Sequence, residues 1–348
     1  MATNILSGET RIPDVSAIVS AFGTFYQSNW DKIWRAAYFS MFDPANPFSL
    51  ADRCMMLDGV NKPQMLPSTK TGNVIQKQNS KQVNIKGQTT FEGRSLAPEA
   101  WKIEQLFNHM EVWQGYVQTL RLQRDGLVPS NQNLITDIHN IIVAEVFKRG
   151  GADLREALYK GVKAVGTGHL DLLDGFNKIM KDAATAGDHT PLAVTATSAS
   201  DVFPKIRQVV SALGDAYKRD QNCIVKVAPN VYDFIREKQD GGGTTPTIYI
   251  TNGNREEIAR DIASTPLPSF PNVKVIEEPY LKTNAIVASV KENFVVGFDS
   301  MDPMAQMDMQ KQYQEIYMVA TGAIGVQVRQ FKSEFGEKPF VCNEAAVA

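Results

Sequence analysis

The segment from Gly166 to Asp171 is the part of this sequence that most resembles a nucleotide-binding loop. It reads Gly-Thr-Gly-His-Leu-Asp and begins as a glycine-rich phosphate loop does, but Asp171 stands where a third glycine belongs. A bound phosphate would meet that carboxylate unfavourably. Glycines are equally typical of turns, because they tolerate positive φ angles. We therefore predict a turn here, and no cofactor.

His169, close to Asp171 and Asp174, has the composition of a general-base site. No nucleophile or oxyanion donors accompany it, so we interpret it as a surface histidine near two carboxylates. The motifs GxxxxGK[ST], GxSxG and HExxH do not occur in the sequence. The histidines are also too scattered to share a metal on one helix: His109, His139, His169 and His189. We predict no catalytic residue and no metal site.

Charge and cysteine usage exclude several further classes. The 348 residues contain 36 Lys and Arg against 38 Asp and Glu, so the chain lacks the overall basic character that holds nucleic acid by counterion release. No uninterrupted apolar run is long enough to predict a membrane helix, and the first residues lack the pattern of a secretion signal. The cysteines are odd in number and far apart, which favours folding in a reducing compartment: Cys54, Cys223 and Cys342.

Two segments of the N-terminal third need a partner surface. Residues 14–42 predict an amphipathic helix rich in aromatic residues, Trp30 and Trp34 among them, which packs on its own core or on a neighbouring subunit. Residues 61–91 contain five lysines and no Asp or Glu, a local charge of +5. Short alternating stretches predict a two-stranded ribbon, which has too few apolar residues to be stable alone. Its lysines are either solvated or dock on an acidic neighbour.

The remaining chain predicts a long helix and then an α/β domain. Apolar spacing favours a helix over residues 131–161, whereas 101–124 fits strand or helix. A helix is predicted from Val202 to Tyr217, with a buried strand after it at 223–227. Further predicted elements are a helix at 231–238, a strand at 273–276, strands at 285–290 and 294–298 paired through a turn at 291–293, and sheet over 313–331.

This order of elements resembles the major capsid protein of tailed double-stranded-DNA phages, of the Hong Kong ninety-seven type. The segment Leu172–Ile179, which contains Asp174-Gly175, is similar to the family's segment between the long helix and the axial domain. The stretches 273–281 and 291–299 resemble the axial domain's "V-V-(x)-P-x-L" and the following "(K/R)-N-(L/F)-V-x-G-x-D" strand. Gly325–Arg329 resembles the family's closing strand.

The resemblance implies an α+β capsid fold with five parts. They are an N-terminal arm (1–60), an extended loop (61–112), a peripheral domain with the long spine helix (113–164 and 285–335), an axial α/β domain (165–284) and a C-terminal tail (336–348). The expected function is structural rather than enzymatic: self-assembly into pentamers and hexamers of an icosahedral shell around phage DNA. Inter-subunit contacts are expected at Lys77, Lys81, Lys86, Trp30 and Trp34.

The resemblance also implies partners and a location. The partners are other copies of the chain, a portal protein, optional scaffolding and decoration proteins, and packaged DNA bound without sequence specificity; no membrane is involved. The expected location is the virion, after assembly in the bacterial cytoplasm. Some relatives crosslink a hairpin Lys to a neighbour's Asn, but no Asn occurs here between Asn293 and Asn343, where the acceptor is expected. The sequence therefore favours non-covalent contacts.

Two alternatives remain open on the sequence alone. An encapsulin-type nanocompartment would use the same fold to enclose a cargo enzyme, and a cytosolic α/β enzyme would use residues 165–300. The length of 348 residues, with a long arm and a long hairpin, favours a phage capsid over the nanocompartment.

Overall fold

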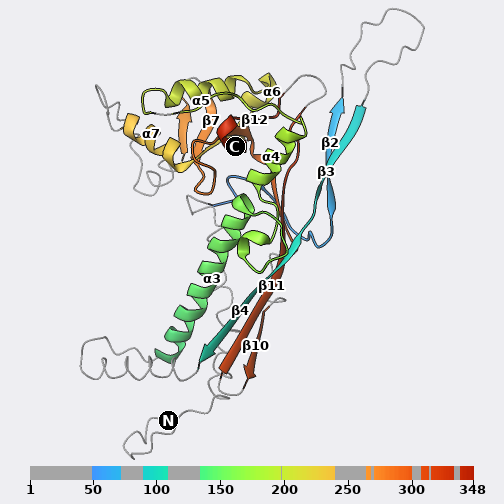
Figure 1. The fold of residues 1–348 in the computed structure, drawn as a ribbon, viewed down its shortest axis with the longest axis vertical. Coiled ribbons are helices and arrows are strands. Elements are labelled where there is room, and N and C mark those ends of the chain that lie inside the picture. The colour runs from blue at the N-terminus through green and yellow to red at the C-terminus, as the bar shows by residue number, and fades with distance from the viewer. Residues whose placement is uncertain are drawn as a thin grey trace, which may run out of the picture. The chain divides into compact units, whose positions relative to one another are not determined.

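The computed structural model describes residues 49–71, 89–108, 134–196, 198–239, 264–267, 270–299, 307–312, 315–332 and 338–348. The chain divides into two compact units. The first comprises 1–39, 102–150 and 302–322, and the second comprises 40–101, 151–301 and 323–348. Helix α3 (Leu134–Lys160) and strand β11 (Glu315–Val328) contribute residues to both units (Figure 1).

The first unit combines strands with the N-terminal half of α3. Strand β10 (Met307–Gln312) pairs antiparallel with β11, from Met307 opposite Ala320 to Gln312 opposite Glu315. A Cβ added at Gly150 of α3 would lie 2.6 Å from Cδ1 of Ile103 in β4 (Glu99–Asn108), so the glycine allows close packing of helix on strand. The helix predicted at 131–161 is confirmed, and it continues through Gly150. β4 shows that 99–108 is strand.

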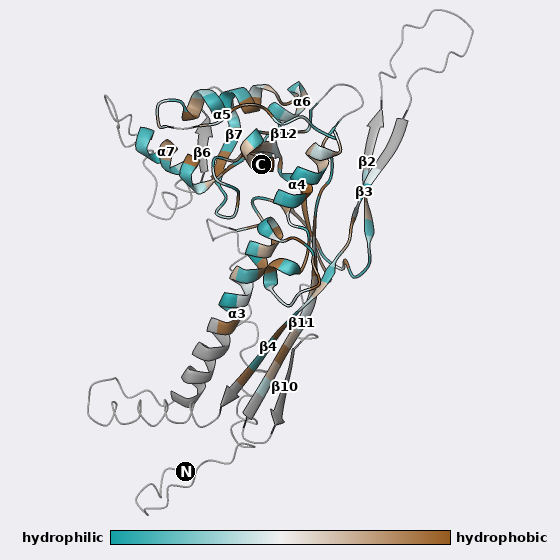
Figure 2. Cartoon of the chain, in the orientation of Figure 1, coloured by the Kyte–Doolittle hydropathy of each residue, from teal (hydrophilic) through white to brown (hydrophobic). Residues whose placement is uncertain are grey.

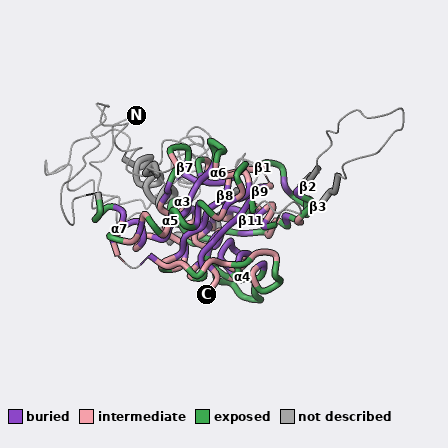
Figure 3. The backbone as a smooth tube through the Cα atoms, turned by 90° about the horizontal axis from the view of Figure 1, so that it is seen from above, coloured by how far each residue is buried: buried purple, intermediate pink, exposed green. Residues whose placement is uncertain are grey.

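The second unit contains a five-stranded sheet. Its order is β12-β8-β5-β7-β6, in which β5 and β7 are parallel and the other pairs antiparallel. The strands are β5 (Cys223–Val227), β6 (Ser264–Leu267), β7 (Phe270–Glu277), β8 (Ile286–Val290) and β12 (Phe340–Cys342). Every residue of β5 is buried, as is typical of a central strand covered on both faces. The first four residues of its neighbour β8 are buried as well (Figure 3).

Helices α5 (Val202–Ser211) and α7 (Pro229–Gln239) pack on this sheet. Figure 2 shows hydrophilic and hydrophobic residues alternating along α5, whose buried residues are Val202, Ile206, Val209 and Val210. The helix predicted as far as Tyr217 ends earlier, because Gly214 leaves the helix and its N–H donates to the Lys338 carbonyl at 3.0 Å. The short helix α6 (Asp215–Lys218) follows. The unit also contains α4 (Phe176–Thr185), α9 (Glu344–Val347) and the 3-10 turns His169–Asp171 and Lys291–Asn293.

Strand β9 (Phe294–Phe298) lies in a different sheet from β8, so the predicted pairing of 285–290 with 294–298 is wrong. β9 pairs in parallel with β1 (Met55–Leu57) and antiparallel with residues 324–328 of β11. The intervening Lys291–Asn293 forms a 3-10 turn instead of a hairpin turn. Asn293 then bonds Gln330 through both ends of its amide, at 2.8 and 2.7 Å, which directs the chain toward β11.

A separate two-stranded ribbon is formed by β2 (Gln64–Thr71) and β3 (Thr89–Leu96), which we call the β2–β3 ribbon. The two strands pair antiparallel along their full length, from Gln64 opposite Leu96 to Thr71 opposite Thr89. A two-stranded ribbon was predicted for residues 61–91, and the structure has one whose described strands lie on either side of the stretches where strands were predicted. Those stretches, within 72–88, lie outside the described residues.

The end of α3 passes unusually close to the start of α4. Gly175 N–H donates to the Gly161 carbonyl at 2.9 Å. A Cβ on Gly175 would lie 2.7 Å from the backbone carbon and oxygen of Tyr159, closer than real Cβ contacts allow. Packing therefore explains the glycine of the Asp174-Gly175 pair, because only glycine lets the two chain segments approach so closely.

In the parts of the chain that the structure describes, no helix combines the length and apolar character required to span a membrane.

We expect Gly175→Ala to lower the free energy of unfolding by about 1–3 kcal/mol, because the new methyl group meets backbone atoms that cannot turn away. Gly168→Ala is the matched control, since the nearest atom to its Cβ is the flexible Asp171 carboxylate at 3.0 Å. Urea unfolding followed by circular dichroism measures both. Equal losses in the two variants would contradict the close approach of α3 and α4.

Candidate functional site

The most highly charged buried site in the described chain surrounds Glu278, in the second unit. Glu278 follows β7 and has no exposed surface. Arg53 Nη1 lies 2.9 Å from Oε2, and Arg155 Nη2 lies 3.3 Å from Oε1. Tyr159 Oη donates to Oε2 at 2.9 Å. Both carboxylate oxygens therefore accept hydrogen bonds, as a buried charge requires.

Local structure brings these groups together. Arg155 and Tyr159 are four residues apart on α3 and so lie on the same face of the helix. Arg53 sits in a single helical turn that precedes β1, in which Cys54 N–H donates to the Leu50 carbonyl at 2.8 Å. Arg53 Nη1 also donates to the Glu277 carbonyl. The site therefore joins the start of the described chain, the spine helix and the end of a central strand.

Lys226 of β5 completes the cluster, although it has no carboxylate in direct contact among the described residues. Its side chain is 1% exposed. Nζ lies 3.2 Å from Tyr159 Oη and 3.4 Å from Cys54 Sγ. The ammonium also lies 3.7 Å from the centre of the Phe294 ring, within the range of a cation–π interaction.

Burial and neighbouring charges shift the pKa values of the cluster. Burial opposes the charged form of Glu278, but Arg53 and Arg155 outweigh it, so the pKa of this carboxyl stays below its usual value. Burial lowers the pKa of Lys226. Burial, and then the negative charge of Glu278, raise the pKa of Tyr159 well above its usual value. Since all these groups are buried, the cluster holds chain segments together and presents no reactive group to a substrate.

The base of the β2–β3 ribbon is fixed by a second set of contacts in the same unit. Leu66 and Leu96 are buried against Val60 and Val295. Arg329 donates to the Pro67 carbonyl from Nε at 3.0 Å and from Nη2 at 2.7 Å. This end of the ribbon is therefore anchored on β9 and on the segments that follow β1 and β11.

Asn293 and Asn343 are both held inside the fold. The amide of Asn293 bonds the Ser289 hydroxyl and the Gln330 backbone. Asn343 donates to the carbonyls of Val194 and Asn284, at 2.9 and 2.7 Å, and its oxygen accepts from Ile286 N–H at 2.9 Å. Neither side-chain amide is therefore presented as an acceptor for a lysine from another subunit.

The glycine-rich segment is a turn, as predicted. The Asp171 carboxylate accepts from Gly168 N–H at 3.2 Å, so it occupies the place where a phosphate would have to bind. His169 Nε2 lies 3.4 Å from a carboxylate oxygen of Glu156, rather than beside Asp174. Among the described residues, no three His, Cys, Asp or Glu side chains are arranged to hold a metal ion.

All five contact residues predicted from the sequence lie outside the described residues: Lys77, Lys81, Lys86, Trp30 and Trp34. The structure therefore brings none of them together. Sequence reasoning missed Arg53 and Glu278. The only signal available was an acidic pair, Glu277-Glu278, directly after an apolar strand, and such a pair usually marks a solvated strand end.

Solved structures match this chain over most of its length. A chain of the satellite phage P4 procapsid, a particle that includes the size determination protein Sid, aligns with 90% of this chain and 98% of its own, at 12% identity and a TM-score of 0.50. A chain of the cyanophage A-1(L) capsid aligns with 86% of this chain and 92% of its own, at 9% identity and a TM-score of 0.53. This chain has a phage capsid protein fold. The α+β, Hong Kong ninety-seven-type fold predicted from the sequence is thereby confirmed.

Comparison of sequences alone does not identify this fold. No family model matches the chain, and no curated protein matches it. The fold is thus shared at identities of 12% and 9%, where most residues differ.

We expect Glu278→Gln to destabilise the capsid fold by about 3–5 kcal/mol, because it leaves two buried guanidinium groups without their counter-ion. The pH dependence should also change. Since the folded pKa of Glu278 is lowered, its stabilisation is complete above about pH 4.3, the unfolded value, and is lost as the pH falls through the folded pKa. Urea unfolding across this acid range should show that loss in the parent chain and not in the variant.

Lys226→Met is the matched variant for this test. Burial lowers the pKa of Lys226, so its charged form is unfavourable inside the fold. The substitution removes this charge and keeps a side chain of similar length, so the free energy of unfolding should stay the same or rise. A Glu278→Gln chain as stable as the parent, or a Lys226→Met chain as damaged as Glu278→Gln, would contradict the assigned role of the carboxylate.

Proposed function

We propose that this chain is the major capsid protein of a tailed double-stranded-DNA phage. It assembles with copies of itself into pentamers and hexamers of an icosahedral shell around the genome, and it acts as a structural protein rather than an enzyme. The observation that carries this proposal is the match of fold over 90% of this chain and 98% of a P4 procapsid chain. The buried, unreactive character of the Glu278 cluster agrees with a structural role.

The β2–β3 ribbon supports an inter-subunit role. Its base is anchored in the second unit, through Leu66, Leu96 and the Arg329–Pro67 contact. Met65 of this ribbon is 71% exposed. A two-stranded ribbon is marginal in water without a further surface, so we assign that surface to a neighbouring copy. Residues 61–112 would then be the extended loop, with the other four parts bounded as the resemblance implies.

Other partners follow from the same proposal. The shell would include a portal protein, would use scaffolding or decoration proteins as separate chains, and would contact DNA on its inner face without reading sequence. It would be found in the virion, after assembly in the host cytoplasm. Because Asn293 and Asn343 are buried and hydrogen-bonded, we infer that the shell is held by non-covalent contacts.

Expression of the full chain should give closed shells or isolated capsomers, seen by size-exclusion chromatography and negative-stain imaging. The control is Glu278→Gln, which should give fewer particles because its subunit is less stable. Shells that contain a cargo protein would favour the nanocompartment instead. Only monomers or small oligomers, with or without phage companion proteins, would contradict the capsid assignment and favour an enzyme.

Reversal of the lysines in the predicted loop tests how the subunits dock. We expect the triple variant Lys77→Glu, Lys81→Glu and Lys86→Glu to impair assembly and leave the subunit folded, because the basic loop would then repel an acidic neighbour. The matched control reverses three lysines elsewhere, at positions 238, 332 and 338, all of them exposed. Normal particles from the loop variant would rule out the docking role of these lysines. An equal loss of assembly in the two triple variants would show a general effect of charge and would also contradict that role.

A further inference from the structure

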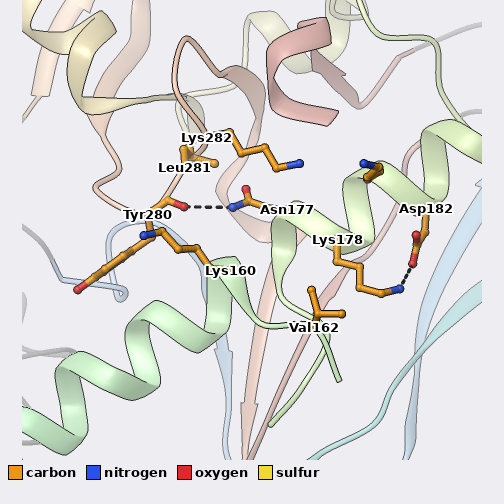
Figure 4. Close-up of a pocket in the computed structure, with 9 residues that line it drawn as sticks. Lys160, Val162, Asn177, Lys178, Asp182, Tyr280, Leu281 and Lys282 are labelled. Atoms are coloured by element: carbon orange, nitrogen blue, oxygen red, sulfur yellow. Dashed lines mark hydrogen bonds and ion pairs between the residues drawn. The ribbon is translucent and has the colours of Figure 1, made fainter. Parts of the chain in front are cut away.

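A pocket of about 570 Å³ opens on the second unit where three segments meet. Lys160 and Val162 line it from the end of α3, four residues of α4 line a second side, and Tyr280, Leu281 and Lys282 line the third. Figure 4 shows the side chains of Lys160, Lys178 and Lys282 around this space. The lining therefore combines several ammonium groups with a few apolar side chains.

Two of the four lysines already have carboxylate partners. Lys160 Nζ lies 3.0 Å from Glu156, and Lys178 pairs with Asp182 and, at 3.7 Å, with Asp174. Lys181 has no ion pair within the described part of the chain. Lys282 Nζ donates to a main-chain oxygen of Ala348, the last residue of the printed sequence. Burial and the positive charge of Lys181 both lower the pKa of Lys282. Both ammonium groups line the pocket, so a bound anion would offset the repulsion between them.

The buried side-chain amide of Asn177 is a second, independent indication that the pocket binds a ligand. Only 5% of this residue is exposed, and it lines the pocket. Its Nδ2 donates to the Tyr280 carbonyl at 3.1 Å, as the dashed line in Figure 4 shows. That bond fixes the amide orientation, and Oδ1 is left buried with no donor among the described residues. Because an unmatched buried acceptor is unfavourable, the site calls for a ligand with an N–H or O–H group.

We propose that this pocket binds an acidic peptide segment of a partner protein. A carboxylate of the segment pairs with Lys181 and Lys282, and a neighbouring backbone N–H donates to Asn177 Oδ1. Apolar atoms of the segment contact Val162 and Leu281. Duplex DNA fits less well, because its phosphates only accept hydrogen bonds and cannot satisfy Asn177. The proposal depends on the pocket alone and holds whether or not the chain forms a shell.

The test is fluorescence anisotropy of a short labelled polyglutamate peptide with the purified full chain at low salt. We expect binding that polyglutamine of equal length does not show. The double variant Lys181→Gln and Lys282→Gln should weaken it about tenfold or more. Lys238→Gln is the matched control, because Lys238 is exposed on α7 outside the pocket, and it should leave binding unchanged.

A backbone N-methylated polyglutamate tests the Asn177 contact without altering the protein. It keeps every carboxylate and loses its N–H donors, so we expect weaker binding than that of the parent peptide. Absence of polyglutamate binding, or equal binding by the double variant or by the N-methylated peptide, would overturn the proposal. A general anion site would also overturn it. Such a site would bind duplex DNA or inorganic phosphate as tightly as the peptide, with the same dependence on Lys181 and Lys282.

Discussion

The rest of the second unit depends on one buried carboxylate. Glu278 is fully enclosed and accepts from Arg53, Arg155 and Tyr159, which come from two distant parts of the sequence. Removing a charge from water is costly, and here the neighbouring guanidinium groups offset that cost. Because the Glu278 bonds span more than a hundred residues of chain, the α/β sheet, the spine helix and the segment before the β2–β3 ribbon are constrained together.

The connection of these elements through Glu278 suits a structural protein, whose function depends on a fixed shape. The base of the β2–β3 ribbon is packed and hydrogen-bonded through Leu96 and Arg329, and β1 lies beside β9 in the same unit. A force applied to the ribbon by a neighbouring copy would therefore reach the core of the subunit. Tyr280, which lines the pocket, lies two residues after Glu278 in the sequence, so a peptide bound there would contact the same loop.

Spacing and composition predicted several of the elements. The long helix, the central strand at 223–227 and the basic ribbon all follow from spacing and composition. Pairing was harder to predict, because β8 and β9 are both largely apolar and carry no sign of which sheet each joins. The helix predicted to Tyr217 failed for a similar reason: the Gly214 bond to Lys338 is a long-range contact that no local pattern encodes.

The buried ionic cluster could not be predicted, because Arg53 and Glu278 are 225 residues apart and read locally as solvated charges. The resemblance to capsid proteins supplied the fold, through the order of weak motifs such as Asp174-Gly175. It could not supply the contacts inside the fold, which depend on which charges become buried together. The contacts predicted for Lys77 and Trp30 concern other copies of the chain and lie outside the described residues.

The central claim is that this chain is a shell subunit whose ribbon is completed by a neighbour. A cryo-electron microscopy map of particles assembled from the purified chain tests this claim most directly. The account predicts rings of five and six subunits in which residues 64–71 and 89–96 lie across an adjacent copy. Particles in which the ribbon folds back on its own subunit, or a preparation with no ring of subunits at all, would contradict it.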